Sequence, residues 1–277
     1  MKKIITLHFC LFTFFAIISF SACDKVEGPY GEAGTIAVNN RKVLIEDFTG
    51  HTCQNCPDAH IEAERLHNIY GNRLVILDVH WGYYAKPQAS PYSDDFRNPV
   101  DSILATTFGV SLYPSGVVNR LYNPVSHRQT ILGWSEWETS VDSILSRPAD
   151  ATLRISNYFS ATDSMMNTTV RTSMANNYSN PIGLAVYFTE DSIISAQKVG
   201  PIDSLNYIHR HMLRGSFNGA FGETISSDVV AGDVYTNSYN MKVSPQTANV
   251  SQIYIVALLF DIITKQIIQV EEKKLIP

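Results

Sequence analysis

The sequence has few cysteines and little charge of either sign. Four cysteines in 277 residues are too few for a fold built on disulfides, so the core must be hydrophobic. Lys and Arg number 21 against 26 Asp and Glu, so no basic excess exists and we expect no binding to nucleic acid. The apolar fraction of 45% excludes general disorder. The 14 Tyr and 13 Phe favour a β-rich chain.

The N-terminus carries a mostly apolar run, which Lys2 and Lys3 precede and Ser21-Ala22-Cys23 follows. This pattern predicts a secretory signal peptide over residues 1–22, because the run is shorter than the about 20 apolar residues of a spanning helix. Residues 20–23 resemble a lipoprotein signal. The resemblance implies that Cys23 carries lipid, which would fasten the chain to a membrane without a spanning segment. Residues 23–41 are then expected to be the lipidated tether.

Two thiols are expected to remain in the mature chain. Signal cleavage would remove Cys10 and lipidation would use Cys23, which leaves Cys53 and Cys56 as a C-x-x-C pair. A closed four-cysteine zinc site would need a second pair, and the sequence has none. A copper site that includes His60 is a weaker alternative. We therefore expect no metal and no cofactor.

Residues 42–147 have an α/β pattern. Apolar runs predict strands at 43–48, 73–81 and 116–121, and helices are expected at 57–70, 101–108 and 134–145. Residues 82–100 are rich in proline and polar side chains, and we expect an inserted loop there. Its aromatic residues could form a recognition rim beside the thiols; they are Trp81, Tyr83, Tyr84 and Tyr92.

From residue 148 to residue 277 the pattern changes to short strands separated by turn residues. We expect strands near 153–159, 166–174, 182–188, 234–243, 252–260 and 262–270. This spacing is typical of an all-β, immunoglobulin-like sandwich domain, with its boundary near residue 148. If residues 207–213 formed one strand, His209 and His211 would share a face.

The pair Cys53 and Cys56 falls where a predicted strand runs into a predicted helix. Unpaired N–H groups and the dipole at a helix N-terminus stabilise a thiolate and lower its pKa. We therefore expect Cys53 to be an exposed nucleophile and Cys56, one turn further in, to be a buried resolving thiol. The neighbours Thr52, Gln54 and Asn55 are expected to contact a substrate.

A second segment strengthens this interpretation. Residues 108–115 resemble the cis-proline loop that faces the C-x-x-C pair in thioredoxin-fold proteins. The resemblance implies a cis bond before Pro114, since cis peptides are essentially confined to proline. It also implies that the backbone of Tyr113 pairs with an extended substrate. The sequence therefore predicts a thioredoxin-like α/β domain over residues 42–147, followed by the all-β sandwich.

The same resemblance points to an acid beneath the thiols. Asp47 matches the position of the buried acid that accepts the proton of the resolving cysteine in thioredoxins. Glu46 is a competing candidate, because strand alternation points only one of the two side chains toward the thiols.

Motifs in both halves carry a narrower resemblance. Residues 49–57 read TGHTCQNCP, residues 209–215 read HRHMLRG, and Asn218-Gly219 follows. With these motifs the chain resembles the outer-membrane-protein-28-related lipoproteins of Gram-negative bacteria. The resemblance implies an outer-membrane lipoprotein, periplasmic or surface-facing, in which a thioredoxin-like domain precedes a β-domain.

Two hypotheses on function follow. In the first, the pair exchanges disulfides with a protein substrate outside the cytoplasm. In the second, the chain is a non-catalytic binding lipoprotein, adhesin- or receptor-like, and the C-x-x-C pair is a structural disulfide.

Overall fold

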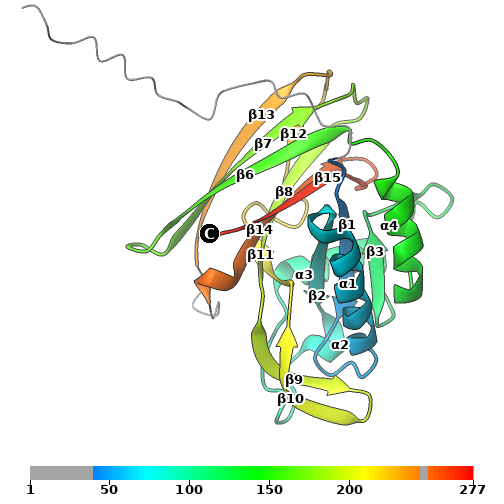
Figure 1. Cartoon of the computed structure of the whole chain (residues 1–277), viewed down its shortest axis with the longest axis vertical. Helices are drawn as coiled ribbons and strands as arrows, with labels where there is room; N and C mark the ends of the chain where they lie inside the picture. The colour runs from blue at the N-terminus through cyan, green and yellow to red at the C-terminus, as the bar shows by residue number, and fades with distance from the viewer. Residues whose placement is uncertain (1–39, 244–248, 277) are drawn as a thin grey trace, which may run out of the picture. The chain divides into compact units, whose positions relative to one another are not determined.

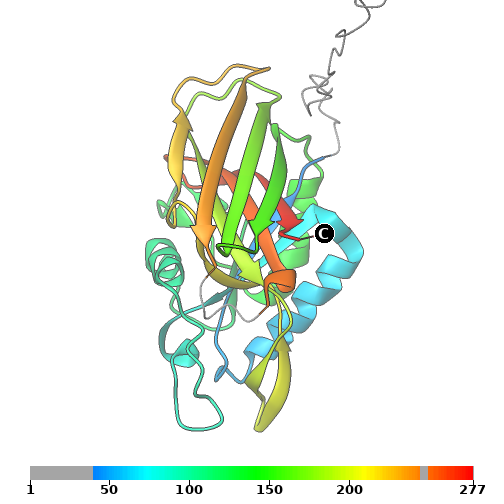
Figure 2. The same cartoon turned by 90° about the vertical axis from the view of Figure 1, so that its left-hand side faces the viewer.

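The computed structural model describes residues 40–243 and 249–276 (Figures 1 and 2). The predicted signal peptide, the lipid attachment at Cys23 and almost all of the tether lie outside the described residues. Strands hold far more of the described residues than helices do.

The helices are α1 (Cys56–Tyr70), α2 (Gly82–Ala85), α3 (Pro99–Phe108) and α4 (Trp137–Leu145), with 3-10 turns at Gly71–Arg73, Trp134–Glu136 and Val250–Gln252. The strands are β1 (Val43–Thr49), β2 (Leu74–His80), β3 (Ser115–Val118), β4 (Tyr122–Asn123), β5 (Arg128–Gln129), β6 (Ala151–Ser160), β7 (Met165–Met174), β8 (Ile182–Glu190), β9 (Ile193–Val199), β10 (Ile202–His209), β11 (Met212–Ser216), β12 (Glu223–Ser226), β13 (Val234–Lys242), β14 (Ile253–Asp261) and β15 (Ile267–Lys274).

Strands β1 and β2 are parallel neighbours, and α1 connects them in the sequence. Strand β3 pairs with β1 in the antiparallel sense. Every residue of β1 and β2 is buried, as expected of parallel strands that helices cover. Helices α1 and α4 pack on one face of these strands, and α3 packs on the other. The helix expected from residue 101 begins at Pro99, because Asn98 caps it and accepts a hydrogen bond from the Val100 N–H.

The large sheet is mixed and has the strand order β15-β14-β8-β11-β2-β1-β3, with β12 paired to β8. Strand β11 lies between β2 and β8: Met212 pairs in parallel with Asp78 and in the antiparallel sense with Glu190. The predicted boundary near residue 148 therefore does not divide the sheet. The physical reason is that one edge of β2 would otherwise have unpaired backbone N–H and C=O groups. Strand β11, from far along the chain, pairs with that edge.

A second layer of strands covers the part of this sheet that contains β8 and β14. The three strands in the order β13-β7-β6 pack against β8 and β14 through a shared apolar core (Figure 2). Buried and half-buried residues alternate along β7, the pattern of a strand with one face on a core. Two packed sheets of this kind form a sandwich, but one of them continues into the α/β part of the molecule.

Two strand pairs lie outside both sheets. Strand β4 pairs with β5, and β9 pairs with β10 to form a hairpin that projects beside α1 (Figures 1 and 2). Residues 207–213 are not one strand, since β10 ends at His209 and β11 begins at Met212. His211 lies between them with a φ of 50°, so His209 and His211 are not on a common strand face.

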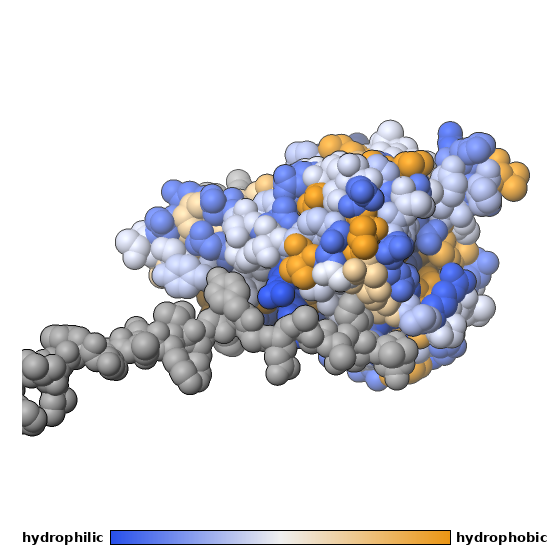
Figure 3. All heavy atoms as spheres, turned by 90° about the horizontal axis from the view of Figure 1, so that it is seen from above, coloured by the Kyte–Doolittle hydropathy of each residue, from blue (hydrophilic) through white to orange (hydrophobic). Residues whose placement is uncertain are grey.

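In the described ranges no helix is both long enough and apolar enough to span a membrane. On the face of the molecule shown in Figure 3, apolar side chains occur in small groups among hydrophilic ones.

Candidate functional site

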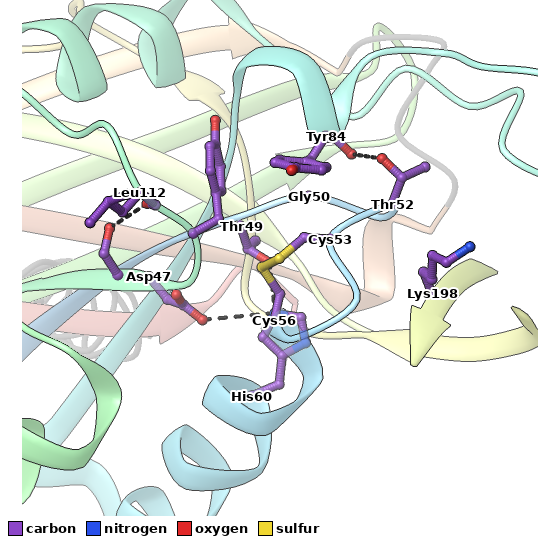
Figure 4. Close-up of a disulfide and its surroundings, with 12 residues drawn as sticks. Asp47, Thr49, Gly50, Thr52, Cys53, Cys56, His60, Tyr84, Leu112 and Lys198 are labelled. Carbon is purple, nitrogen blue, oxygen red and sulfur yellow. Dashed lines mark hydrogen bonds and ion pairs between the residues drawn. A yellow bond between two sulfur atoms is a disulfide. The ribbon is translucent and has the colours of Figure 1, made fainter. Parts of the chain in front are cut away.

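The C-x-x-C loop connects the carboxyl end of β1 to the start of α1, as the sequence predicts (Figure 4). Cys53 and Cys56 form a disulfide, with their Cα atoms 5.5 Å apart. Cys56 is the first residue of α1, and Pro57 follows it in the first turn, where its missing N–H costs no hydrogen bond. Cys56 is fully buried, as expected. The expectation that Cys53 is exposed is wrong, because this side chain is only 4% exposed and meets solvent at a cleft.

The cleft has a volume of about 560 Å³, and Cys53 lies in its wall. Its lining comprises Thr52, Cys53, Gln54, Asn55, Tyr83, Tyr84, Gln88, Tyr92, Ser111, Leu112, Tyr113 and Lys198. The loop at residues 111–113 thus faces the disulfide, and the Tyr113–Pro114 bond is cis, as predicted. The residues predicted from sequence to contact a substrate therefore surround one cavity.

Residues from the insertion form one wall of the cleft. The Tyr84 carbonyl accepts hydrogen bonds from the N–H and the hydroxyl of Thr52, at 3.1 and 3.0 Å. Gly50 allows this close approach, because a Cβ on it would lie 2.5 Å from the Tyr84 carbonyl carbon. Trp81 stacks on Tyr113, with ring centroids 5.7 Å apart.

The β9–β10 hairpin, which the sequence reasoning missed, contributes Lys198 to the cleft and holds the C-x-x-C loop. The Lys198 N–H donates to the His51 carbonyl at 2.8 Å. The buried side chain of Gln197 donates to the Cys53 carbonyl at 3.1 Å. A signal was present: Gly200-Pro201 separates two apolar-containing runs, as in a hairpin turn.

The two acidic candidates point to opposite faces of β1. Glu46 lies on the α3 face, where its carboxylate accepts a hydrogen bond from Arg120 Nη2 at 2.6 Å. Neither side chain of this ion pair is exposed. Asp47 lies on the α1 face, near the Cys56 end of the disulfide (Figure 4). The geometry thus places Asp47, and not Glu46, on the side of the thiols.

Asp47 belongs to a buried group that includes Asp78, its register partner on β2. His60, one turn beyond Cys56, has its Nε2 atom 3.7 Å from Asp47 Oδ2 and 3.9 Å from Asp78 Oδ2. Burial raises the pKa of Asp47 well above its usual range, and Asp78 raises it further. Burial likewise raises the pKa of Asp78 to about 7 and lowers that of His60 to about 4. Burial therefore disfavours the charged form of each of these three side chains.

Three further histidines are buried around Phe96. The rings of His51, His80 and His209 lie 5.3, 5.4 and 5.1 Å from the Phe96 ring, centroid to centroid. Burial lowers the pKa of His80 well below its usual range and that of His209 to about 3, so both are neutral at pH 7.

The sulfur atoms that the alternative copper site would use, those of Cys53 and Cys56, are bonded to each other in this structure. Both ring nitrogens of His60 also have hydrogen-bond partners. Across residues 40–243 and 249–276, no group of three His, Cys, Asp or Glu side chains has the arrangement of a metal site.

Fold and site together define a mostly-β protein with one large mixed sheet and a C-x-x-C disulfide at a helix start. The model of a family described as outer membrane protein Omp28 matches residues 101–277, more than half of the sequence. The chain therefore belongs to this family, which confirms the predicted resemblance and the outer-membrane location.

The solved structures include one with the same fold, HBP35 of Porphyromonas gingivalis. It shares 16% sequence identity at a TM-score of 0.67, over 85% of this chain and 75% of that one. Protein AGR_C_4864 from Agrobacterium tumefaciens has 12% identity and a TM-score of 0.49, over 85% and 95% of the two chains. A domain of the outer membrane lipoprotein Omp28 from Porphyromonas gingivalis has 21% identity and a TM-score of 0.32, over 46% and 88%. None of the curated proteins matches the sequence significantly.

Proposed function

We propose that this outer-membrane protein exchanges disulfides with a protein substrate through Cys53 and Cys56. One observation carries the proposal: the Cys53–Cys56 disulfide at the start of α1 borders a cleft that the cis-proline loop also lines. A disulfide beside a cavity is accessible to another protein chain. A disulfide that only stiffens the helix does not require a cavity beside it.

The proposal includes a thioredoxin-like arrangement for residues 42–147 and an immunoglobulin-like one for residues 148–277. The parallel β1-α1-β2 unit, the antiparallel β3 and the cis-proline loop support the first. The packing of β6, β7 and β13 on β8 and β14 supports the second. We further propose that lipid on Cys23 anchors the chain to the membrane.

The exchange has two steps in the reducing direction. The Cys53 thiolate attacks one sulfur of a substrate disulfide, so a mixed disulfide forms and the other substrate sulfur leaves as a thiolate. Cys56 then loses its proton and attacks the Cys53 sulfur, which releases the second substrate thiolate. The substrate gains two electrons, and the pair becomes the disulfide seen in the structure. The reverse sequence oxidises a dithiol substrate.

The surrounding residues have separate roles in this mechanism. Asp47 accepts the proton of Cys56, since it is buried on the α1 face of β1. The backbone of Tyr113 aligns an extended substrate in the cleft, and Thr52, Gln54 and Asn55 contact it beside the sulfur atoms.

A redox titration tests the proposal. Protein lacking residues 1–23 is equilibrated in graded thiol–disulfide buffers, and we expect a potential between about −120 and −270 mV, the range of exchange catalysts. A potential below about −300 mV identifies a structural disulfide and overturns the proposal. Cys53→Ser abolishes exchange, whereas Cys56→Ser still attacks a substrate and accumulates the mixed disulfide. Equal exchange by wild type and Cys53→Ser also contradicts the mechanism.

A second candidate function, binding of a protein partner, rests on the surface of the β9–β10 hairpin. Ile194, Ile202 and Leu205 are exposed to 66%, 67% and 61%. If the titration gives a structural disulfide, the partner-binding function becomes the leading one. It then predicts that serine at these three positions abolishes retention of a partner that the unaltered protein retains.

A further inference from the structure

A second hollow lies on the molecule, and it shares none of its lining residues with the cleft. It is a groove of about 620 Å³ between α1 and strand β10. His60, Asp78, Tyr207 and His211 are among its lining residues. The groove therefore brings solvent to His60 and Asp78, neither of which lines the cleft.

His60 joins the inner acid to this groove. Its Nε2 atom lies between Asp47, which is fully buried, and Asp78, which borders the groove, at 3.7 and 3.9 Å from their Oδ2 atoms. Thr49 Oγ1 lies 3.0 Å from the same nitrogen, and the Tyr207 hydroxyl lies 2.8 Å from Nδ1. Two hydrogen bonds thus hold the ring beside both carboxylates.

The oxygens of Asp47 have no hydrogen-bond partner among the described residues. A buried carboxyl without partners is costly in a structural role alone, because its desolvation is not compensated. A proton carrier, in contrast, needs an acceptor that no other group occupies.

Other ionisable groups also face this site from the elements packed around it. They are Glu64 on α1, His80 on β2, Asp191 after β8, His209 on β10, and Arg210 and His211 before β11. Glu64 is already paired, 3.6 Å from His211 and 3.5 Å from Arg210. Asp191 is paired as well, since its Oδ1 atom lies 3.4 Å from Arg210 Nη1. Asp47 and Asp78 are therefore the carboxylates left to exchange protons with His60.

We propose that His60 relays the proton of Cys56 between Asp47 and solvent in the groove, through Asp78. This inference rests on the proposed opening and closing of the Cys53–Cys56 disulfide. His60 acts through Asp47 and does not itself contact the sulfur atoms. A displacement of about 1 Å brings its Nε2 within the 2.6–3.2 Å at which protons transfer, and such contacts are commonly long in unliganded sites.

The steps balance in protons and electrons. When a dithiol reductant opens the disulfide, its two sulfur atoms lose two electrons and the Cys53 and Cys56 sulfurs gain them. The Cys56 sulfur takes a proton from Asp47, which regains one from His60 Nε2. Asp78 supplies His60 and is refilled from water in the groove. Closure of the disulfide runs the same path outward. Because the pKa of Asp78 is about 7, this residue both holds and releases a proton at neutral pH.

The test measures reduction of the disulfide by dithiothreitol, which needs no natural substrate. The rate is followed by mass after thiol alkylation, between pH 5.5 and 8.5, in wild type and in His60→Ala. Because a positioned acid or base contributes about 10²–10⁴-fold to a rate, we expect His60→Ala to be at least about tenfold slower, with a changed pH profile. Free imidazole, which can enter through the groove, should restore the rate.

Asp78→Asn should slow the reaction in the same way, since it interrupts the path at the groove. His127→Ala, at an exposed histidine outside both hollows, is the matched control and should leave the rate unchanged. A variant that merely misfolds does not recover with imidazole. Wild-type rates and pH profile in His60→Ala would overturn the relay, whatever the redox potential is. A potential below about −300 mV with a slow, imidazole-rescued variant would instead overturn the exchange function and keep the relay.

Discussion

Arg120 and Glu46 form an ion pair deep inside the molecule, with no exposed surface on either side chain. The Tyr187 hydroxyl lies 3.2 Å from Arg120 Nη2, and the Phe108 ring lies 5.2 Å from the guanidinium carbon. The attraction between the two charges offsets the cost of taking each of them out of water, and either charge alone would be strongly disfavoured by burial.

Removal of one partner should therefore be much worse than removal of both. We expect Glu46→Leu to lower the free energy of unfolding by about 3–5 kcal/mol, because it leaves the Arg120 charge buried and unpaired. The double variant with Arg120→Met should recover a large part of this loss. Denaturant unfolding of the two variants measures the difference, and equal destabilisation would contradict the explanation.

At the scale of residues, the sequence predicted part of the site. Cys53 and Cys56 were identifiable because their spacing and the strand-to-helix context are local. The choice between Asp47 and Glu46 was not, because it depends on Arg120, which is 74 residues from Glu46. The link from Asp47 to His60 and Tyr207 was equally hidden, since Tyr207 comes from a strand in the other half of the chain.

At the scale of elements, the β9–β10 hairpin holds the C-x-x-C loop in place. Its backbone donates to the carbonyls of His51 and Gln54, each at 2.8 Å. Gln197 Nε2 adds contacts to the carbonyls of Cys53 and Gly50, at 3.1 and 3.4 Å. The loop that carries the disulfide therefore depends on a segment far from it in sequence.

Gln197→Leu should loosen this loop without an effect on the rest of the fold. The leucine has similar size but cannot donate, so the buried carbonyls lose a partner at a cost of about 1–3 kcal/mol. We expect faster hydrogen exchange at the amides of residues 51–56 and lower stability. Asn206→Leu on the exposed side of the same hairpin is the control. Unchanged exchange in the loop would show that the hairpin does not restrain it.

The sequence predicted the long elements better than the short ones. Helix α1 and strands β1, β2 and β7 were found within a residue or so, because each has a clear apolar pattern. Strand β15 begins at Ile267 rather than at residue 262, because Asp261 accepts hydrogen bonds from the N–H groups of Ile263 and Thr264 and forms a turn. Strand β11 has five residues and no alternation in burial, so nothing local marks it.

At the scale of the whole molecule, stability should depend on pH through the buried histidines. The pKa of His209 is about 3 in the folded protein, because burial disfavours its charged form, against 6.5 in an exposed histidine. The unfolded chain therefore binds more protons between these values, so this histidine's contribution to stability is complete above pH 6.5 and is lost as the pH falls. Asp47 and Asp78 have raised pKa values in the folded protein, so their contribution to stability increases as the pH falls.

A comparison with a variant separates the two trends. His209→Phe should keep the apolar contacts with Phe96 and remove one proton-linked term. Between pH 6 and pH 4 we expect wild-type stability to fall relative to the variant by about 1.4 kcal/mol per pH unit. Unfolding in denaturant at several pH values measures this slope, and parallel curves for the two proteins would be inconsistent with a buried, neutral His209.

The position of β11 has a consequence for the chain before it is folded. A polypeptide that crosses a membrane from its N-terminus delivers β2 long before it delivers Met212, the residue that pairs with Asp78. Until then the edge of β2 is open, and an open edge is a template for strands of other chains. Contacts between residues so distant in sequence also form slowly. Transit to the outer membrane therefore includes a period of exposure to aggregation, and a chaperone that shelters extended strands would act during that period.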